Sequence, residues 1–527
     1  MRALALKGPA LIASALTLAL FSIAPSTAAP DADLLYRAHC AQCHGADRLG
    51  LQGPALLPEN LGRLKPAQAA GVIANGRVAT QMPAFGGALS DVEIKALAEY
   101  IYQAPAEAPR WGAPEIIASH ELAADRDELT ARPIFDADPL NLFVVVESGD
   151  HHVSIVDGDR FEVIHRFASR FALHGGPKFS PDGRFVYFMS RDGWVTKFDL
   201  YNLAVVAETR AGINARNIAL SGDGRYVAVA NYLPPTLVFL DARDLSLVKL
   251  LEVRDATGTK SSRVSAVYQA KPRNSFIVAL KDIPEIWEIS YDRNAPPVFT
   301  GLVHSHEKGM VEGLPASPGS FAVRRMELAE PLDDFMFDPE YRHLLGASRD
   351  GGGAVVVNLN VGRPIATVPL DGLPHLGSGI TWELDGRRVM ATPHLNRNLI
   401  SIIDMKDWRI VRQIPTEGPG FFLRSHENSP YAWADAMMGA KKDGLQLIDK
   451  RTLEIVKVLR PAPGKTAAHV EFTRDGRYAL ASIWEMDGAI VVYDARTFTE
   501  IKRLPMVKPS GKYNVYNKIS LSEGTSH

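Results

Sequence analysis

Two thiols and an imidazole stand together near the start of the chain, in the run Cys40-Ala41-Gln42-Cys43-His44. Two cysteines at this spacing can form thioethers with the two vinyl groups of one porphyrin, and the adjacent histidine can then bind the iron. The pattern C-x-x-C-H therefore indicates one covalently attached haem c. The sequence has two cysteines in all. A disulfide and a redox-active C-x-x-C pair are the alternatives, but neither gives His44 a role.

A second axial ligand for this haem is predicted at Met82, in the run Gln-Met-Pro-Ala-Phe over 81–85. Small class I cytochromes c place a Met-Pro pair ahead of their last helix, and thioether ligation raises the potential of the iron. The alternative is that Met82 only fills the core.

Helices must position these ligands. The pattern predicts helices over 34–41, 67–75 and 90–102, with Ser90 as the N-cap of the last and acidic residues in its first turn. We expect a small all-α class I cytochrome c domain over 29–105, followed by a proline-rich linker over 106–139.

The first 28 residues resemble a secretory signal peptide. Arg2 and Lys7 precede an apolar run over 11–23, and small residues end at Ala28. No later stretch approaches ~20 uninterrupted apolar residues, so no membrane span is expected. Because covalent haem attachment of this kind takes place outside the cytoplasm, we expect a soluble periplasmic protein.

Composition limits the remaining possibilities. The 58 basic and 60 acidic residues nearly balance, which gives no electrostatic case for binding nucleic acid or an acidic membrane. The 42 glycines and 35 prolines are spread along the chain, as suits many short turns. A polar insertion at about 304–324 is interpreted as a surface loop or a partner-docking loop.

The segment over 140–527 is repetitive. An apolar pair followed by Asp recurs at intervals of 42 to 46 residues, with Asn in one copy and a weaker copy near Trp287. A D-G-R turn lies upstream of four copies. Short strands at this period indicate propeller blades rather than a solenoid. We predict an all-β eight-bladed β-propeller, with the Asp or Asn positions at Asp157, Asp199, Asp241, Asn358, Asp404, Asp449 and Asp494.

Three of the 15 histidines precede D-G-R turns by similar distances: His174, His375 and His469. We expect them to enter the central channel at similar depth, where the glycines near His174 and His375 leave room for a large flat ligand. The alternative is that they are ordinary turn histidines.

The combination resembles the cytochrome cd1 family over essentially the whole mature chain. The resemblance rests on the haem c motif, the propeller and four further runs, at 111–115 (W-G-A-P-E), 141–143, 155–159 and 511–517. It implies that the propeller binds haem d1 non-covalently and that His174 is the proximal iron ligand.

The family contains nitrite reductases, with two distal histidines, and a branch that acts in haem d1 biosynthesis. His375 matches one distal position, whereas Asp333 stands at the other, and His469 stands where the reductases lack histidine. This pattern is similar to the biosynthetic dihydro-haem d1 dehydrogenases. Two alternatives remain: an NO-forming nitrite reductase with an altered pocket, and a non-catalytic haem d1 carrier.

The biosynthetic resemblance implies dehydrogenation of a propionate of dihydro-haem d1 to the acrylate of haem d1, with electrons passing to haem c. His174 and His375 would hold the substrate iron, and His469 would be the base, because a neutral imidazole suits proton abstraction near pH 7. Arg191 and Arg216 would grip substrate carboxylates, or would be solvated turn residues. Expected partners are a cytochrome cd1 nitrite reductase or other haem d1 maturation proteins, and a periplasmic electron acceptor.

Overall fold

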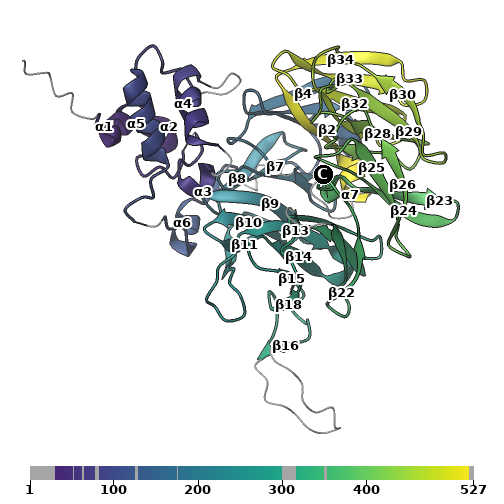
Figure 1. The fold of residues 1–527 in the computed structure, drawn as a ribbon, viewed down its shortest axis with the longest axis horizontal. Coiled ribbons are helices and arrows are strands. Elements are labelled where there is room, and N and C mark those ends of the chain that lie inside the picture. The colour runs from purple at the N-terminus through teal and green to yellow at the C-terminus, as the bar shows by residue number, and fades with distance from the viewer. Residues whose placement is uncertain are drawn as a thin grey trace, which may run out of the picture.

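The computed structural model describes residues 30–51, 53–61, 64–76, 82–107, 109–124, 129–174, 176–299, 316–348 and 353–520. A cluster of helices lies beside a much larger array of strands (Figure 1). The expected signal peptide over 1–28 and most of the expected insertion at 304–324 lie outside the described residues. The domain boundaries given above remain predictions. Among the described residues, no helix combines the length and apolar character needed to span a membrane.

Two helices of the helical part, over 32–39 and 91–101, begin at residues whose side chains cap them, Asp31 and Ser90. Ser90 Oγ accepts from the Glu93 backbone N–H, and Glu93 Oε2 accepts from the Ser90 N–H at 2.8 Å, which is a capping box. The three predicted helices are confirmed with small shifts, and the first is divided at Cys40. The helices are α1 (Ala32–His39), α2 (Ala41–His44), α3 (Pro58–Leu61), α4 (Pro66–Asn75), α5 (Asp91–Ile101) and, in the linker, α6 (Ala113–Ala118).

In the described part of the chain, eight antiparallel sheets, seven of four strands and one of five, are the blades of the propeller, so the predicted eight blades are confirmed. The fifth strand of the second blade is the short β1 (Glu121–Leu122). A separate pair, β16 (Val298–Phe299) and β17 (Ala316–Ser317), lies on either side of residues 300–315, which are outside the described residues.

Within each blade, four strands follow one another from the channel outward. Blade 1 contains β35 (Pro509–Asn514), β2 (Leu142–Glu147), β3 (His152–Asp157) and β4 (Glu162–Ala168); blade 2 contains β5 (Lys178–Phe179), β6 (Phe185–Met189), β7 (Trp194–Asp199) and β8 (Ala204–Arg210); blade 3 contains β9 (Asn214–Leu220), β10 (Tyr226–Leu233), β11 (Thr236–Asp241) and β12 (Leu247–Glu252); blade 4 contains β13 (Val264–Ala270), β14 (Ser275–Leu280), β15 (Glu285–Ser290) and β18 (Val323–Glu327). Blade 5 contains β19 (Asp334–Phe337), β20 (His343–Ala347), β21 (Ala354–Asn358) and β22 (Arg363–Val368); blade 6 contains β23 (Ile380–Leu384), β24 (Arg387–Pro393), β25 (Leu399–Asp404) and β26 (Arg409–Pro415); blade 7 contains β27 (Leu423–Arg424), β28 (Tyr431–Asp435), β29 (Leu445–Asp449) and β30 (Ile455–Leu459); blade 8 contains β31 (Ala467–Phe472), β32 (Tyr478–Ile483), β33 (Gly488–Asp494) and β34 (Glu500–Met506).

The repeated Asp or Asn ends the third strand of its blade and caps the turn that follows. Asp157 Oδ1 accepts from the backbone N–H two residues on at 2.8 Å, and Asp494 Oδ1 does the same at 2.9 Å. Asn358 makes the same bond at 2.9 Å, because an amide oxygen accepts as a carboxylate oxygen does. The turn explains why one copy tolerates Asn.

The ring is closed by the end of the chain. Strand β35 pairs with β2, so one blade is built from both ends of the propeller segment. A final helix, α7 (Val515–Ser520), then lies near the centre of the view (Figure 1). The apolar core lies between neighbouring blades: Val144 of blade 1 belongs to one buried cluster with Val186 and Phe198 of blade 2.

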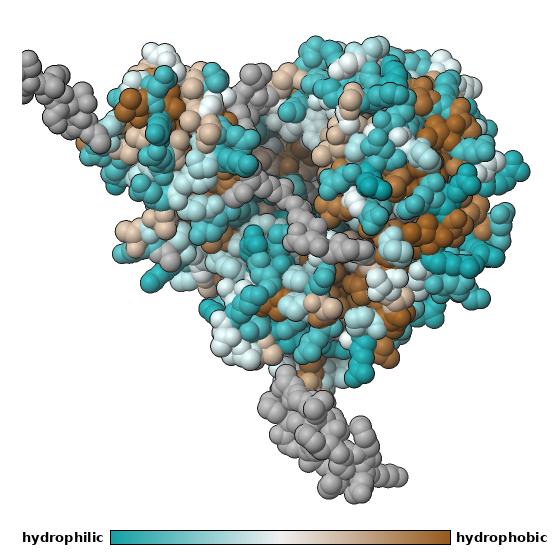
Figure 2. All heavy atoms as spheres, viewed as in Figure 1, coloured by the Kyte–Doolittle hydropathy of each residue, from teal (hydrophilic) through white to brown (hydrophobic). Residues whose placement is uncertain are grey.

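The helical part contacts blades 2 and 3. The guanidinium of Arg210 donates to the backbone carbonyls of Leu49 and Gly50, and Arg210 Nε donates to the Asp192 carbonyl at 2.9 Å. The Trp111 ring covers the same guanidinium at 4.5 Å. On the face shown in Figure 2, hydrophilic residues predominate over the helical part, and hydrophobic residues gather mainly over the blades. The contact holds the C-x-x-C-H side of the helical part against the propeller.

Candidate functional site: a c-type haem motif and a histidine cavity

The C-x-x-C-H residues fit a covalently attached haem. Cys40 and Cys43 are free thiols. His44 is 8% exposed, and its Nδ1 lies 2.7 Å from the Pro54 carbonyl oxygen. A carbonyl can only accept, so Nδ1 carries the proton and Nε2 keeps its lone pair for a metal. Burial lowers the pKa of His44 and favours this neutral form.

Close packing fixes the ring of His44. A Cβ at Gly53 would lie 2.7 Å from Cε1 of that ring, so a side chain at this position would displace the imidazole. Met82 packs against the same helical core that contains Cys40. Cys40, Cys43 and His44 therefore fit a haem c, and Met82 as a further ligand is a proposal.

A short series of contacts leads from this site into the propeller. Ala55 and Leu57, just after Pro54, are buried against Ile213. Ile213 immediately precedes β9, and three residues on, the carbonyl of Arg216 accepts from His174. The backbone partners of His44 and His174 are therefore joined by one packing contact and two short stretches of chain.

The two predicted channel histidines His174 and His375 line one cavity of about 680 Å³, called here the histidine cavity. His174 precedes the inner strand of blade 2 and His375 precedes that of blade 6, so they face the channel from opposite sides of the eight-bladed ring. This volume lies within the range of small-molecule sites. Apolar walls with a few convergent polar groups suit a tetrapyrrole.

The two histidines are held in the same way. Nδ1 of His174 lies 2.8 Å from the Arg216 carbonyl oxygen, and Nδ1 of His375 lies 2.8 Å from the Phe421 carbonyl oxygen. Each carbonyl fixes the tautomer in which Nε2 bears the lone pair, as in metal-binding histidines. Burial is the first cause of the lowered pKa of His375, which keeps that ring neutral.

Both predicted arginines, Arg191 and Arg216, also line the histidine cavity. Arg216 has a second role in this structure, because its Nη1 lies 3.0 Å from Nε2 of His174. A metal at that nitrogen would require the guanidinium to move away. Arg216 can therefore give up its contact with the His174 imidazole and bind a carboxylate of a ligand in the cavity instead.

Asp333, which stands at the expected distal position, lines the same cavity but is ion-paired with Lys281. Its neighbour Asp334 accepts from the Gly377 N–H at 2.7 Å and from Tyr268 Oη at 2.6 Å. Asp334 thereby anchors the loop that carries His375.

The prediction that His469 lies at the same depth as the other two histidines is wrong. His469 lies within β31, is fully buried, and contacts Phe422 and Tyr513, which line the histidine cavity. The strand register shifts between Ala468 and Val470, and His469 has φ +48°. This β-bulge places the ring one side-chain layer behind the cavity wall.

The environment of His469 keeps it neutral. Neither ring nitrogen has a hydrogen-bond partner among the described residues. Burial, followed by the charges of Lys512 and Arg424, holds its pKa well below the usual value. An unprotonated, unpartnered imidazole beside the cavity is a group that can accept a proton.

Sequence reasoning did not assign roles to two neighbours of His469. Burial raises the pKa of Tyr513 to about 12, so its hydroxyl keeps its proton. Lys512 is fully buried and donates to the His469 carbonyl and to Ser482 Oγ. Lys512 lies in the run Pro-Ser-Gly-Lys-Tyr-Asn of β35, which is not apolar, so the sequence carries no signal that this lysine is buried.

Comparison with protein families gives two matches. Residues 137–308 and 316–518 match the cytochrome D1 heme domain, and residues 27–101 match subunit III of cbb3-type cytochrome c oxidase. The two matches correspond to the propeller and to the helical part.

Individual proteins give the same result. The chain is 58% identical to the dihydro-heme d1 dehydrogenase of Pseudomonas aeruginosa, over 98% of this chain and 100% of that protein. It is 24% identical to a nitrite reductase of Stutzerimonas stutzeri over 92% of each chain, and 28% identical to the protein NirF of Pseudomonas aeruginosa over 70% of this chain and 90% of that one. A solved structure of dihydro-heme d1 dehydrogenase NirN in complex with DHE matches with a TM-score of 0.85 and 59% identity, over 93% of this chain and 100% of that chain. The chain belongs to the cytochrome D1 heme domain family.

Proposed function

We propose that this protein is an oxidoreductase of haem d1 biosynthesis that converts a propionate of dihydro-haem d1 to the acrylate of haem d1. The 58% identity to a dihydro-heme d1 dehydrogenase over nearly the whole chain supports this function. The single structural observation that carries it is the neutral, unpartnered imidazole of His469 beside the cavity that His174 and His375 line.

His174 and His375 hold the substrate iron from opposite sides of the channel. Their Nδ1–H groups are already bound to backbone carbonyls, so both Nε2 atoms are oriented before the substrate arrives. Arg216 leaves His174 as the iron approaches and, with Arg191, binds substrate carboxylates, since a guanidinium can form two parallel bonds to one carboxylate.

His469 is assigned as the base that takes the proton from the propionate side chain, which must pass Phe422 or Tyr513 to reach the imidazole behind the cavity wall. The change from –CH₂–CH₂– to –CH=CH– releases two protons and two electrons, and the first proton needs a base that is unprotonated at neutral pH. The lowered pKa of His469 keeps its imidazole unprotonated at neutral pH, and the same shift makes it a weaker base than a solvated histidine. Tyr513, in ring contact at 5.1 Å, helps to fix the imidazole and keeps its own proton.

Cys40, Cys43, His44 and Met82 would hold haem c, which would supply a one-electron outlet in the same chain, so the two electrons would leave one at a time. The buried contact of Ala55 and Leu57 with Ile213 places that motif against the strand that carries Arg216. We propose a periplasmic location after removal of residues 1–28. A periplasmic electron acceptor and a cytochrome cd1 nitrite reductase or other haem d1 maturation protein are the proposed partners.

The test compares His469→Ala with His375→Ala in the full chain carrying haem c. With His469→Ala, the spectrum of bound dihydro-haem d1 should be retained, because His174 and His375 are intact. Its conversion, followed by the loss of two hydrogens in the mass of the tetrapyrrole, should fall by about 10²- to 10⁴-fold. His375→Ala should change the spectrum itself.

His165→Ala, on the outer strand β4 where the ring stacks on Phe167, is the matched control and should leave both readouts unchanged. A wild-type conversion rate in His469→Ala would assign the base to another group. If the wild-type protein binds dihydro-haem d1 but the mass of the tetrapyrrole never falls by two hydrogens, the protein is a carrier and not an enzyme.

A further inference from the structure

A second cavity, of about 990 Å³, lies at the other end of the same inner strands. The segment that leads into β27 contributes Phe422 to the histidine cavity, and the strand itself contributes Arg424 to the second cavity. In the same way, His375 lines the histidine cavity and precedes β23 in the chain. Every residue of β23 lines the second cavity. His469 lies between the two, two residues before Glu471, which lines the second cavity.

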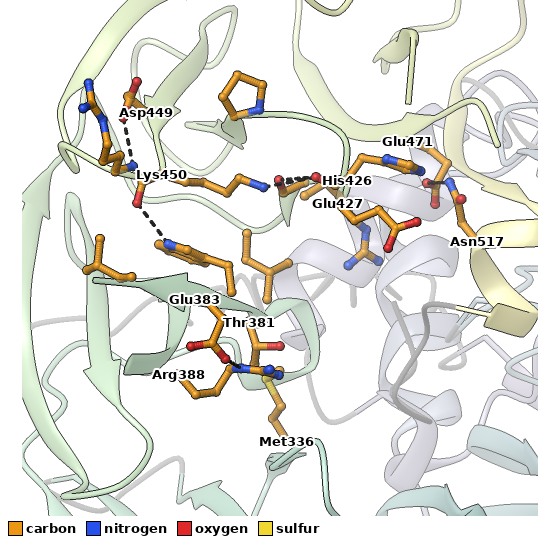
Figure 3. Close-up of a pocket in the computed structure, with 18 of the residues that line it drawn as sticks. Met336, Thr381, Glu383, Arg388, His426, Glu427, Asp449, Lys450, Glu471 and Asn517 are labelled. Carbon is orange, nitrogen blue, oxygen red and sulfur yellow. Dashed lines mark hydrogen bonds and ion pairs between the residues drawn. The ribbon is translucent and has the colours of Figure 1, made fainter. Parts of the chain in front are cut away.

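The walls of the second cavity come from several blades. Figure 3 shows Glu471 and Asn517 hydrogen-bonded to each other on one side, at 3.0 Å, and Arg388 paired with Glu383 on another. Trp382 of blade 6 donates to the Lys450 carbonyl of blade 7 at 3.0 Å, which ties the two blades together at the cavity.

Positive charge is concentrated where the second cavity meets the channel. Arg424 and Lys518 line the cavity, and Lys178 and Lys512 lie within electrostatic reach of them. Glu471 is the acidic residue whose charge acts on Arg424, Lys512 and Lys518 alike. Burial is the first cause that lowers the pKa of Lys512 and of Lys518 to about 7, and burial also lowers the pKa of Arg424. An anion bound in the cavity would stabilise the protonated, charged form of these side chains.

Two buried polar atoms on the wall of this cavity have no partner among the described residues. One is Nη2 of Arg424, a charged donor, and the other is Oδ1 of Asn517, whose side chain is 7% exposed. The Nδ2 of Asn517 is already used by Glu471 and the Phe472 carbonyl, so its orientation is fixed. Buried charged donors are nearly always hydrogen-bonded, so the arginine points to an anionic ligand, and the amide oxygen to water or a hydroxyl bound with it.

We propose that the second cavity is a carboxylate-binding site in which Arg424 and Lys518 hold the anion. A planar carboxylate matches the guanidinium fork better than a spherical anion does. The carboxylate has two possible sources: a small free carboxylate that enters from the mouth of the cavity, or a side-chain carboxylate of a tetrapyrrole in the histidine cavity that reaches past His469 and Tyr513. The second source rests on the proposed function, whereas the site itself does not.

The first arm of the test titrates sodium propionate into the full chain carrying haem c, by calorimetry, at an ionic strength held constant with sodium chloride. Wild type should bind saturably. Arg424→Gln should raise Kd by about 10- to 100-fold, as expected for loss of hydrogen bonds to a charged group. Arg424→Lys should weaken binding less than Arg424→Gln. Arg409→Gln is the matched control, because Arg409 lies on the outer strand β26, is exposed and pairs with Asp407.

The second arm measures Soret titrations with an iron porphyrin that bears two propionates and with its dimethyl ester. If the tetrapyrrole supplies the carboxylate, Arg424→Gln should weaken binding of the acid and leave binding of the ester unchanged. If the carboxylate is free, the acid-to-ester ratio of Kd should not change, and only the first arm should respond to Arg424.

Circular dichroism reports whether each variant folds. If Arg424→Gln does not fold, Lys518→Gln replaces it in both arms of the test. The proposal is wrong if neither propionate nor the acid-to-ester ratio depends on Arg424 or Lys518. Neither arm measures dehydrogenation, so failure of the proposed enzymatic function would leave this result standing.

Discussion

The ammonium group of Lys512 donates a hydrogen bond to the backbone carbonyl of His469. It also donates to Ser482 Oγ at 2.9 Å and is fully buried. The bond joins β35, which closes the ring, to the bulged residue of β31, whose φ is +48°. A sparsely populated backbone conformation persists only where surrounding contacts determine it, so Lys512 is a positioning residue for the proposed base.

Replacing Lys512 with methionine should therefore impair conversion more than binding. The methionine keeps most of the buried volume but leaves the His469 carbonyl without this donor. We expect the spectrum of bound dihydro-haem d1 to persist and kcat to fall by about 10²-fold, the scale of a displacement of about 1 Å. Lys502→Met, at an exposed lysine near Glu162, is the control. An unchanged kcat in Lys512→Met would show that other contacts hold His469.

The number of blades could be read from the sequence because the repeated Asp has a local cause. Each of these residues caps its own turn, as Asp157 does through the N–H of Asp159, and this bond needs no tertiary context. The positions of His174 and His375 followed from the same register, since both precede an inner strand.

The depth of His469 could not be predicted in the same way. The His469 ring lies behind the cavity wall because of a β-bulge inside an apolar strand. The run Ala-Ala-His-Val is equally compatible with a regular strand, so the sequence does not reveal the bulge. Arg424 and Lys512 were missed because their partners are distant in the chain. Lys512 contacts the His469 carbonyl 43 residues away, and such pairings appear only when the ring has closed.

The proposed Met82 ligand can be tested without turnover. In Met82→Ala, haem c should remain attached through Cys40 and Cys43, and its reduction potential should fall because thioether ligation favours the reduced iron. Potentiometric titration of the haem c bands measures the shift. Met486→Ala, on the propeller, should leave the potential unchanged. An unchanged spectrum and potential in Met82→Ala would indicate a different sixth ligand.

Reduction of nitrite to nitric oxide should be poor at neutral pH in the protein loaded with haem d1. The residue at the second distal position is Asp333, and its ion pair with Lys281 makes it a poor replacement for a proton-donating histidine. Steady-state nitrite consumption with a reduced electron donor measures this activity. Turnover as fast as that of a genuine cytochrome cd1 nitrite reductase, measured in parallel, would contradict the biosynthetic function.

Stability against unfolding should rise with pH above neutrality, because two buried lysines bind protons less tightly in the folded state. The pKa of Lys512 and that of Lys518 are each lowered from 10.5 to about 7, with burial as the first cause. Between these values the unfolded chain binds a proton that the folded chain lacks. The free energy of unfolding therefore increases with pH across this window, by up to about 1.4 kcal/mol per pH unit for each lysine.

Urea unfolding of the full chain carrying haem c at pH 7, 8 and 9 measures this slope. The raised pKa of Tyr513 acts in the opposite direction only above about pH 10, where tyrosines of the unfolded chain ionise. Lys512→Met and Lys518→Met should each flatten the slope between pH 7 and 9, whereas Lys502→Met should retain it. A wild-type slope in both buried-lysine variants would mean that these two groups titrate near their ordinary pKa in the folded protein.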